Sequence, residues 1–334
     1  AAIQRNVFIN TDLFGHNGEF NPAQQAQSIQ IELFGNRRVT AYLEDSQQAY
    51  ERGYTLRYSI PSHEYGMALF SVYNDEVEAT IHLDDELYLL HPVGNGQASL
   101  ELTDQTLNFE CGTDDSSAST PPIPGQNNND DNIRYHEFTI DVMTVYTQEA
   151  LSHYSNRDAM YALINLAIFE ANTAYSLSGA YQRLRLVHIG ELFDPEPSDP
   201  TLSDTNEWGL VRDALHDVDG VWDEVHSWRD DYGADFVIGI TEVLTGGNVV
   251  GKAYVMQTLS TSNEVDAFSV VRWSSAAGYH SYTHELGHCM GLRHDSGEVA
   301  SYTSVNSYCA GHDDGGSYRT LMNKNSGTRV LQLS

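Results

Sequence analysis

Residues 284–294 read HELGHCMGLRH, and this stretch decides how the rest of the chain is interpreted. His284 and His288 are four residues apart, so on a helix they lie on one face and can bind one metal ion. Gly291 allows the backbone to turn where the helix should end, which can bring His294 back as a third ligand. Three imidazoles leave the fourth position of a zinc ion open for water, so the spacing predicts a catalytic Zn2+ site.

Glu285 follows the first of these histidines directly. A carboxylate in this place can act as the general base toward a water molecule that zinc activates. A structural zinc site has no need of such a base. Glu285 therefore favours an enzyme over the alternative, which is a non-enzymatic, zinc-stabilised secreted module for binding or adhesion.

The charge balance excludes some classes of partner. The 334 residues include 17 Lys and Arg against 47 Asp and Glu, a formal net charge of −30. A chain this acidic is not expected to bind nucleic acid or an anionic membrane surface. No apolar run reaches the length of a transmembrane helix, so membrane insertion is not expected either. The start, Ala1-Ala2-Ile3-Gln4, fits the end that is left when a signal peptide is removed, which favours a secreted, extracellular protein.

Residues 1–111 predict an antiparallel β domain, because runs such as 55–60 and 78–83 alternate apolar and polar side chains between turn-forming residues. Three histidines of this region show no metal-ligand spacing and are interpreted as ordinary polar residues: His63, His82 and His91. Residues 112–133 are rich in Asp, Asn, Ser and Pro and have almost no apolar side chains. They predict a flexible linker that proteases can reach.

Residues 134–334 predict a mixed, twisted sheet with long helices, so the whole chain is expected to be α+β. Strands are expected at 138–146, 184–189, 234–240, 251–256 and 267–271, and helices at 159–177, 210–228 and 279–290. The last of these helices carries the first two histidines of the metal site.

The extended histidine motif, followed 28 residues later by Met322, resembles the signature of the metzincin metallopeptidases. Four further stretches are similar to bacterial reprolysin or adamalysin-like metzincins and to peptidyl-Asp metalloendopeptidases: 139–146, 170–172, 183–187 and 232–235. The resemblance covers about residues 135–334. It implies an active-site helix, a Met-turn beneath the metal at Met322, and zinc-dependent hydrolysis of peptide bonds in protein or peptide substrates.

The resemblance also implies how a substrate binds. In that family the strand before the zinc helix lines the cleft, and the substrate adds to it as an antiparallel strand. The matching substrate-binding residues are Gly251, Lys252, Ala253 and Tyr254. The peptidyl-Asp relatives imply cleavage on the amino side of acidic residues, for which the cleft needs a basic group. Three residues near the right segment are candidates, with an ordinary surface or capping role as the alternative: Arg293, Arg319 and Lys324.

The three cysteines form an odd count. Cys289 and Cys309 can close a disulfide between the zinc helix and the segment that leads to Met322, with two separate buried thiols as the alternative. Family zymogens carry a propeptide cysteine whose thiolate occupies the open zinc position, and Cys111 ends the first domain where such a residue would stand.

Residues 1–111 would then be an inhibitory propeptide, and activation would cut the linker at 112–133. Cys111 could instead be a structural thiol or form an intermolecular disulfide. The flanking Phe109-Glu110 also departs from the best-known form of the cysteine switch.

Overall fold

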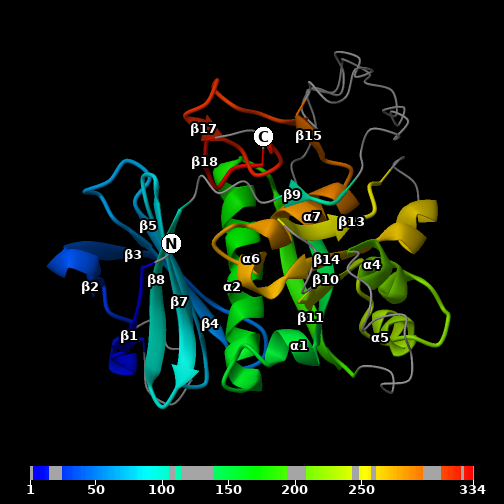
Figure 1. Cartoon of the computed structure of the whole chain (residues 1–334), viewed down its shortest axis with the longest axis horizontal. Coiled ribbons are helices and arrows are strands. Elements are labelled where there is room, and N and C mark those ends of the chain that lie inside the picture. The colour runs from blue at the N-terminus through cyan, green and yellow to red at the C-terminus, as the bar shows by residue number, and fades with distance from the viewer. Residues whose placement is uncertain are drawn as a thin grey trace.

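The computed structural model describes residues 3–14, 25–104, 110–113, 138–193, 208–242, 248–256, 261–295, 310–324 and 327–333. Within these ranges the chain has an α+β architecture with two large sheets (Figure 1). None of the helices seen there is long and apolar enough to cross a membrane.

The first sheet is antiparallel throughout, as predicted, and its strands run in the order β1-β8-β7-β6-β5-β4-β3-β2. Its strands are β1 (Ile3–Phe8), β2 (Ser28–Glu32), β3 (Arg38–Gln48), β4 (Tyr54–Ser59), β5 (Met67–Tyr73), β6 (Glu76–Leu83), β7 (Glu86–Gly94) and β8 (Gln97–Asp104). Tight turns join β5 to β8 in series, with Asn74, Asp84 and Asn95 in the left-handed conformation. This sheet has a core of its own, in which Leu56, Tyr58 and other side chains are fully buried.

The second sheet is mixed, with strand order β11-β10-β12-β14-β13-β9. Its strands are β9 (Glu110–Cys111), β10 (Phe138–Thr147), β11 (Gln182–Leu192), β12 (Phe236–Thr241), β13 (Val249–Ala253) and β14 (Phe268–Arg272). The helices are α1 (Gln148–Leu151), α2 (Arg157–Leu177), α4 (Trp208–His216), α5 (Glu224–Tyr232), α6 (Trp273–Ala276) and α7 (Ser281–Cys289). Two short strand pairs form separate two-stranded sheets: β15 (Arg293–Asp295) with β16 (Ala310–Gly311), and β17 (Tyr318–Arg319) with β18 (Thr328–Arg329).

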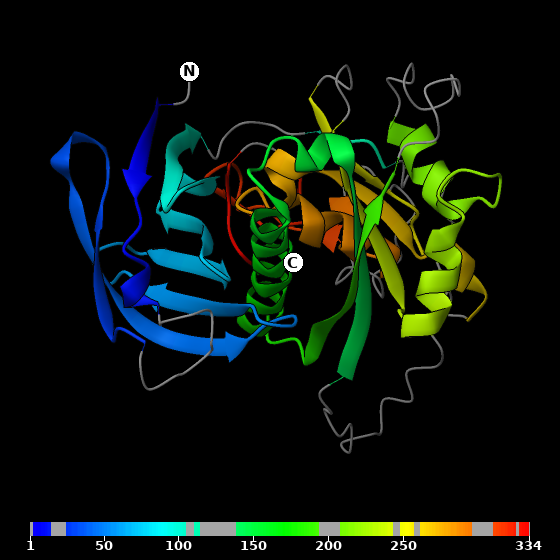
Figure 2. The same cartoon turned by 90° about the horizontal axis from the view of Figure 1, so that it is seen from below.

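Helices cover both faces of the second sheet, because alternate residues of a strand point to opposite sides. On β10, Val142 and Tyr146 join the cluster around α2 and α7, whereas Met143 and Val145 join the cluster around α4 and α5. Figure 2 shows the resulting layers: the first sheet, α2, the second sheet, and then α4 and α5.

One helix prediction is wrong. The single helix expected at 210–228 is two helices, α4 and α5. Between them Gly220 and Trp222 have φ values of 99° and 56°, which an α-helix cannot contain. The Asp223 carboxylate accepts bonds from the backbone N–H groups of Asp219 and Gly220 at 3.1 and 3.0 Å, so this break is a structured turn.

Helix α2 is shared between the two sheets. Of its 21 residues, 15 are buried. It contacts β5 and β6 of the first sheet on one side and β11 and α7 on the other. Leu69 of β5 belongs to the same apolar cluster as α2, so the two large units have a continuous core.

Ionisable side chains are also buried at this junction. Glu170 of α2 accepts hydrogen bonds from Thr80 of β6 at 2.7 Å and from Nδ1 of His280 at 2.9 Å. His82 stacks on His280, with ring centroids 5.2 Å apart, and is only 7% exposed. Burial lowers the pKa of His82 to about 3. The interpretation of His82 as an ordinary polar residue is therefore wrong, because it is part of the contact between the units.

Candidate metal centre

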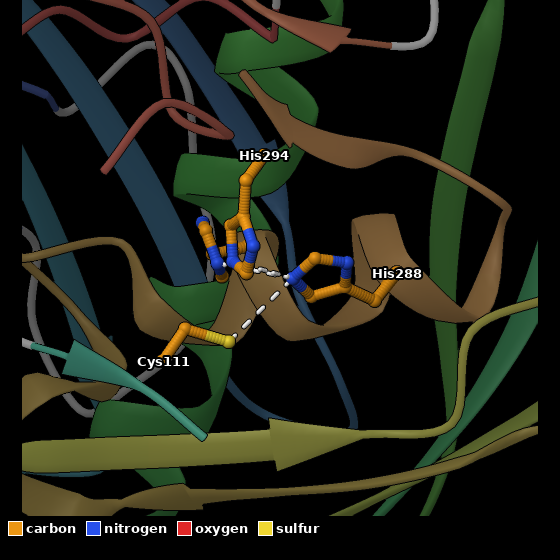
Figure 3. A group of neighbouring side chains, drawn as sticks. Cys111, His288 and His294 are labelled. Carbon is orange, nitrogen blue, oxygen red and sulfur yellow. Dashed lines mark hydrogen bonds between the residues drawn. The ribbon is translucent and has the colours of Figure 1, made fainter. Parts of the chain in front are cut away.

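The three predicted histidine ligands converge at one point. His284 and His288 project from one face of α7, and His294 lies on β15. Gly291 has a φ of 87°, and the Leu292 N–H bonds the Gly287 carbonyl at 2.8 Å, so the chain reverses after the helix. Nε2 of His288 lies 3.2 Å from Nε2 of both other histidines (Figure 3).

Hydrogen bonds fix the orientation of two of the rings. Nδ1 of His284 lies 2.7 Å from the Leu321 carbonyl, and Nδ1 of His288 lies 2.9 Å from the Leu292 carbonyl. A carbonyl only accepts, so each Nδ1 carries the proton and each Nε2 presents a lone pair. Two such nitrogens cannot bond each other, and their lone pairs converge as metal ligands do. Burial, reinforced by the neighbouring imidazoles, lowers the pKa of His284 well below its usual value, which keeps the ring neutral.

Cys111 supplies a fourth donor. Its Sγ lies 3.5 Å from Nε2 of His288, and the four donor atoms of Cys111, His284, His288 and His294 all lie within 4.8 Å of one another (Figure 3). A tetrahedral ion with bonds of about 2.0–2.1 Å to nitrogen and about 2.3 Å to sulfur separates two nitrogens by about 3.3–3.4 Å and nitrogen from sulfur by about 3.5–3.6 Å. The residues present therefore fit a metal held by three nitrogens and one sulfur.

Glu285 lies between this donor set and strand β13. It is 1% exposed, and its Oε2 accepts a bond from the Thr113 hydroxyl at 3.0 Å and lies 3.6 Å from Sγ of Cys111. Burial raises the pKa of Glu285 to about 7, although both of these contacts lower it. A Cβ at position 251 would lie 2.6 Å from Oε1 of Glu285, so only glycine lets β13 pass this close.

Residues 110–113 occupy the edge of β13. β9 pairs with β13 in parallel, with Cys111 opposite Gly251. The Gly112 N–H donates to the Gly251 carbonyl at 2.9 Å, and the Ala253 N–H donates to the Thr113 hydroxyl at 2.8 Å. Two of the expected substrate-binding residues, Gly251 and Ala253, are therefore already paired with this segment.

The other two expected substrate-binding residues differ in position. Lys252 lies on β13 between the two paired residues and is partly exposed. Tyr254 follows the strand, and its hydroxyl donates to Asp213 of α4 at 2.6 Å. The Arg212 guanidinium lies 3.7 Å from the centre of the Tyr254 ring, so this side chain is bound to α4.

Met322 lies in a turn under the active-site helix. It is fully buried, and a Cβ added at Gly287 would lie 2.6 Å from its sulfur. Leu321, in the same turn, supplies the carbonyl that holds His284. The Met-turn assignment stays a prediction that this position supports.

Cys289 is buried and forms no disulfide with another described residue, and its Sγ lies 3.5 Å from the Phe268 carbonyl. Its expected partner, Cys309, lies outside the described residues, so the disulfide stays a prediction.

Two of the three basic candidates are built into the fold. Arg293 and Arg319 are 1% and 3% exposed. Arg319 donates to the carbonyls of Gly327 and Asn323, both at 3.0 Å. Lys324 is partly exposed.

Sequence reasoning missed two residues at this centre, Thr113 and Arg329. The charge of Arg329 is close enough to lower the pKa values of His284 and Glu285. Thr113 could have been found from its position directly after Cys111-Gly112. Arg329 could have been found from the scarcity of basic residues in the chain.

Two helical histidines, a third histidine after a glycine turn and a buried glutamate beside them define the metal centre of a metallopeptidase. The family model described as metallo-peptidase family M12, of the reprolysin type, matches residues 136–334. The chain belongs to this family, and the resemblance drawn from its motifs is confirmed.

Its relatives carry more specific names. The peptidyl-Asp metalloendopeptidase of Stenotrophomonas maltophilia (strain R551-3) is 30% identical over 257 residues, which is 74% of this chain and 56% of that protein. The peptidyl-Asp metalloendopeptidase of Xanthomonas campestris pv. campestris is 29% identical over 255 residues, again 74% of this chain and 56% of that protein. The chain spans about half the length of these curated relatives.

Among solved structures, the chain is similar to metalloproteinase-II from Bacteroides fragilis. The TM-score is 0.49 and the identity 11%, over 92% of this chain and 87% of that chain. A likeness at this level has no bearing on function.

Proposed function

We propose that this chain is a secreted zinc endopeptidase in its latent proenzyme form. The main support for this proposal is that Cys111 completes a tetrahedral donor set with His284, His288 and His294. Three nitrogen donors and a thiolate suit Zn2+ better than Mg2+ or Ca2+, which prefer oxygen. The segment that carries Cys111 also covers Glu285 and the edge of β13.

In the open enzyme His284, His288 and His294 would hold a zinc ion, which would supply Lewis-acid polarisation of the scissile carbonyl and lower the pKa of water. Glu285 is the general base: it takes the proton of the attacking water and delivers it to the leaving amine. Its buried position beside β13 suits this role, because a peptide paired with that strand lies next to the carboxylate. Gly251 and Ala253 then bind the substrate backbone through the groups that now bind residues 112–113.

Latency follows from the competition for these same groups. Residues 1–111 act as the propeptide, 112–133 as the linker that is cut, and 134–334 as the catalytic domain. While the linker is intact, Cys111 competes as an intramolecular ligand with a high effective concentration. After cleavage the first domain can leave, and its binding becomes a weaker bimolecular event.

The substrates are proteins or peptides, cut on the amino side of acidic residues. The names of the peptidyl-Asp relatives support this preference. The Cys289–Cys309 disulfide belongs to the same proposal for a secreted protein, and mass spectrometry of unreduced peptides would detect it.

The test compares peptide turnover by intact wild type, intact Cys111→Ser, and wild type cut within 114–133, with zinc measured in each preparation. We expect zinc in all three and little activity in the intact wild type. The cleaved chain should be fully active. Cys111→Ser should be partly active, because a serine hydroxyl is a poor zinc ligand while the first domain still covers the cleft.

Equal activity of the intact and cleaved wild type would refute latency. Zinc without turnover in any form would instead support the non-enzymatic binding module.

A further inference from the structure

Arg329 lies close to the metal centre although it is distant from the histidine motif in sequence. It belongs to β18, which lies beside β17 (Figure 1). In the register of this pair, Arg329 is opposite Arg319. Two residues after Arg319, Leu321 supplies the carbonyl that orients the His284 ring. Strand β18 therefore lies beside the segment that fixes a metal ligand.

A hydrogen bond also ties the guanidinium to the start of α7. Nη1 of Arg329 donates to the Tyr279 carbonyl at 2.7 Å. The next residue, His280, accepts the backbone N–H of His284 at 3.0 Å. The cation is thus held at the N-terminal end of α7, the helix whose following turns carry His284 and His288.

Among the described residues, this cation forms no ion pair. Nε of Arg329 is buried without a hydrogen-bond partner, and in the described part of the chain no carboxylate lies within ion-pair distance of the guanidinium. Burial lowers the pKa of Arg329 to about 9. A buried cation is unfavourable unless an anion pairs with it. Acidic residues outnumber basic ones 47 to 17, so the lack of an ion pair with Arg329 among the described residues does not come from a shortage of carboxylates.

Arg329 is one of the residues that line a cavity between the carboxyl-terminal segment and the first sheet. Arg329 and Thr328 line one wall, and Glu64 and Tyr65 line the other. The Tyr65 ring packs on Tyr318 with centroids 4.9 Å apart, so the first sheet covers this cavity in the latent chain. Departure of the first sheet would open the Arg329 side to a peptide.

We propose that Arg329 is the specificity-determining residue, and that its guanidinium binds the carboxylate of an Asp or Glu side chain in the substrate, on the carboxyl side of the scissile bond. The planar fork of an arginine matches a carboxylate through two parallel hydrogen bonds. Arg293 and Arg319 are less suited, because they are only 1% and 3% exposed, whereas the side chain of Arg329 is partly exposed. This inference deepens the proposed function and rests on it.

The test uses the full chain cut within 114–133 and peptides that differ only in the residue after the scissile bond, which is Asp, Asn or Leu. We expect wild type to prefer Asp over the isosteric Asn by at least about 100-fold, since bonds to a buried charge are each worth about 1.5–3 kcal/mol. In Arg329→Leu the ratio of turnover of the Asp peptide to that of the Asn peptide should fall toward one, whatever the change in turnover of the Leu peptide. Arg329→Lys should retain a reduced preference.

Arg185→Leu is the matched control for loss of one positive charge, because Arg185 is exposed and pairs with Asp141 on β10. A preference for Asp that survives in Arg329→Leu would overturn the proposal. An equal fall on all three peptides would also overturn it, since Arg329 would then act on every substrate alike. If Arg329→Leu does not fold, Arg329→Lys provides the test. A ratio of Asp-peptide to Asn-peptide turnover equal to that of wild type would then overturn the proposal.

A binding measurement separates this inference from the proposed function. Calorimetry of the cleaved, zinc-stripped chain with peptides that begin with Asp or Asn needs no turnover. We expect Arg329→Leu to weaken binding of the Asp peptide at least about tenfold and to leave the Asn peptide unchanged. Absence of hydrolysis by wild type would refute the peptidase, whereas equal binding of both peptides by wild type would refute the role of Arg329.

Discussion

Thr113→Val should release much of the latency while leaving the metal ligands untouched. The Thr113 hydroxyl donates to Oε2 of Glu285 at 3.0 Å and accepts the Ala253 N–H at 2.8 Å. Thr113 is only 7% exposed, and valine has nearly the same shape. The substitution therefore removes two buried hydrogen bonds from the closed state and creates no large cavity.

The magnitude follows from what remains unpaired. A hydrogen bond to a charged group contributes about 1.5–3 kcal/mol, and a buried donor left without an acceptor costs about 1–3 kcal/mol. Both losses apply only to the closed state, because in the open state Glu285 and Ala253 can bind water or substrate. A difference of about 3 kcal/mol, at about 1.36 kcal/mol per tenfold, raises the open fraction on the order of 100-fold.

The assay is the initial rate of a quenched fluorescent peptide with the intact chain, divided by the rate of the same chain after cleavage within 114–133. The ratio should rise on the order of 100-fold in Thr113→Val. Thr113→Ser keeps the hydroxyl and should stay near wild type. An unchanged ratio in Thr113→Val, with zinc content and folding intact, would show that these two bonds do not hold the segment in place.

Three further outcomes are expected. Glu285→Ala should keep its zinc in metal analysis but lose about 10²–10⁴-fold in peptide turnover after cleavage, and activity like that of wild type would exclude Glu285 as the base. His294→Ala should lose most of its zinc at neutral pH, whereas full occupancy would mean that another residue supplies the third ligand. Because burial lowers the pKa of His82 from 6.5 to about 3, the separated first domain takes up a proton below pH 6.5 that the docked form excludes. Docking of the cleaved domains should therefore weaken by up to about tenfold per pH unit as the pH falls from 6.5 toward 3, measured by sedimentation, and His82→Phe should show a shallower dependence; equal slopes would refute this linkage.

Local patterns in the sequence were sufficient for most elements of the fold. The alternation in residues 138–146 and the apolar spacing in 159–177 predicted β10 and α2 correctly. The helix expected at 210–228 failed because apolar spacing was weighed above the turn chemistry of Asp217-Val218-Asp219-Gly220. His82 was misjudged for a different reason, since it stacks on His280, which a long stretch of chain separates from it.

Some residues of the metal site could also be predicted from local sequence patterns, whereas others could not. His284, His288 and His294 lie within eleven residues, so helix geometry and one glycine turn were enough to bring them together. Thr113 is 172 residues from Glu285 in the chain. Arg329 reaches the centre through the pairing of β17 with β18. Such contacts are set by strand pairing across long stretches of chain, and a single sequence carries no periodic signal for them.

Helix α2 has a consequence for how this protein reaches its native state. Most of its surface is buried, with β5 and β6 on one side and the second sheet on the other. The first sheet is synthesised before α2, so it can offer a finished apolar surface on which the helix docks while the second sheet is still incomplete.

A chain that began at β10 would have to fold around a helix with one bare apolar stripe, and exposed stripes of this kind promote aggregation. On this argument we expect the first sheet to act as a template for α2 during synthesis, and the proposed activation would uncover the surface on which that helix docked.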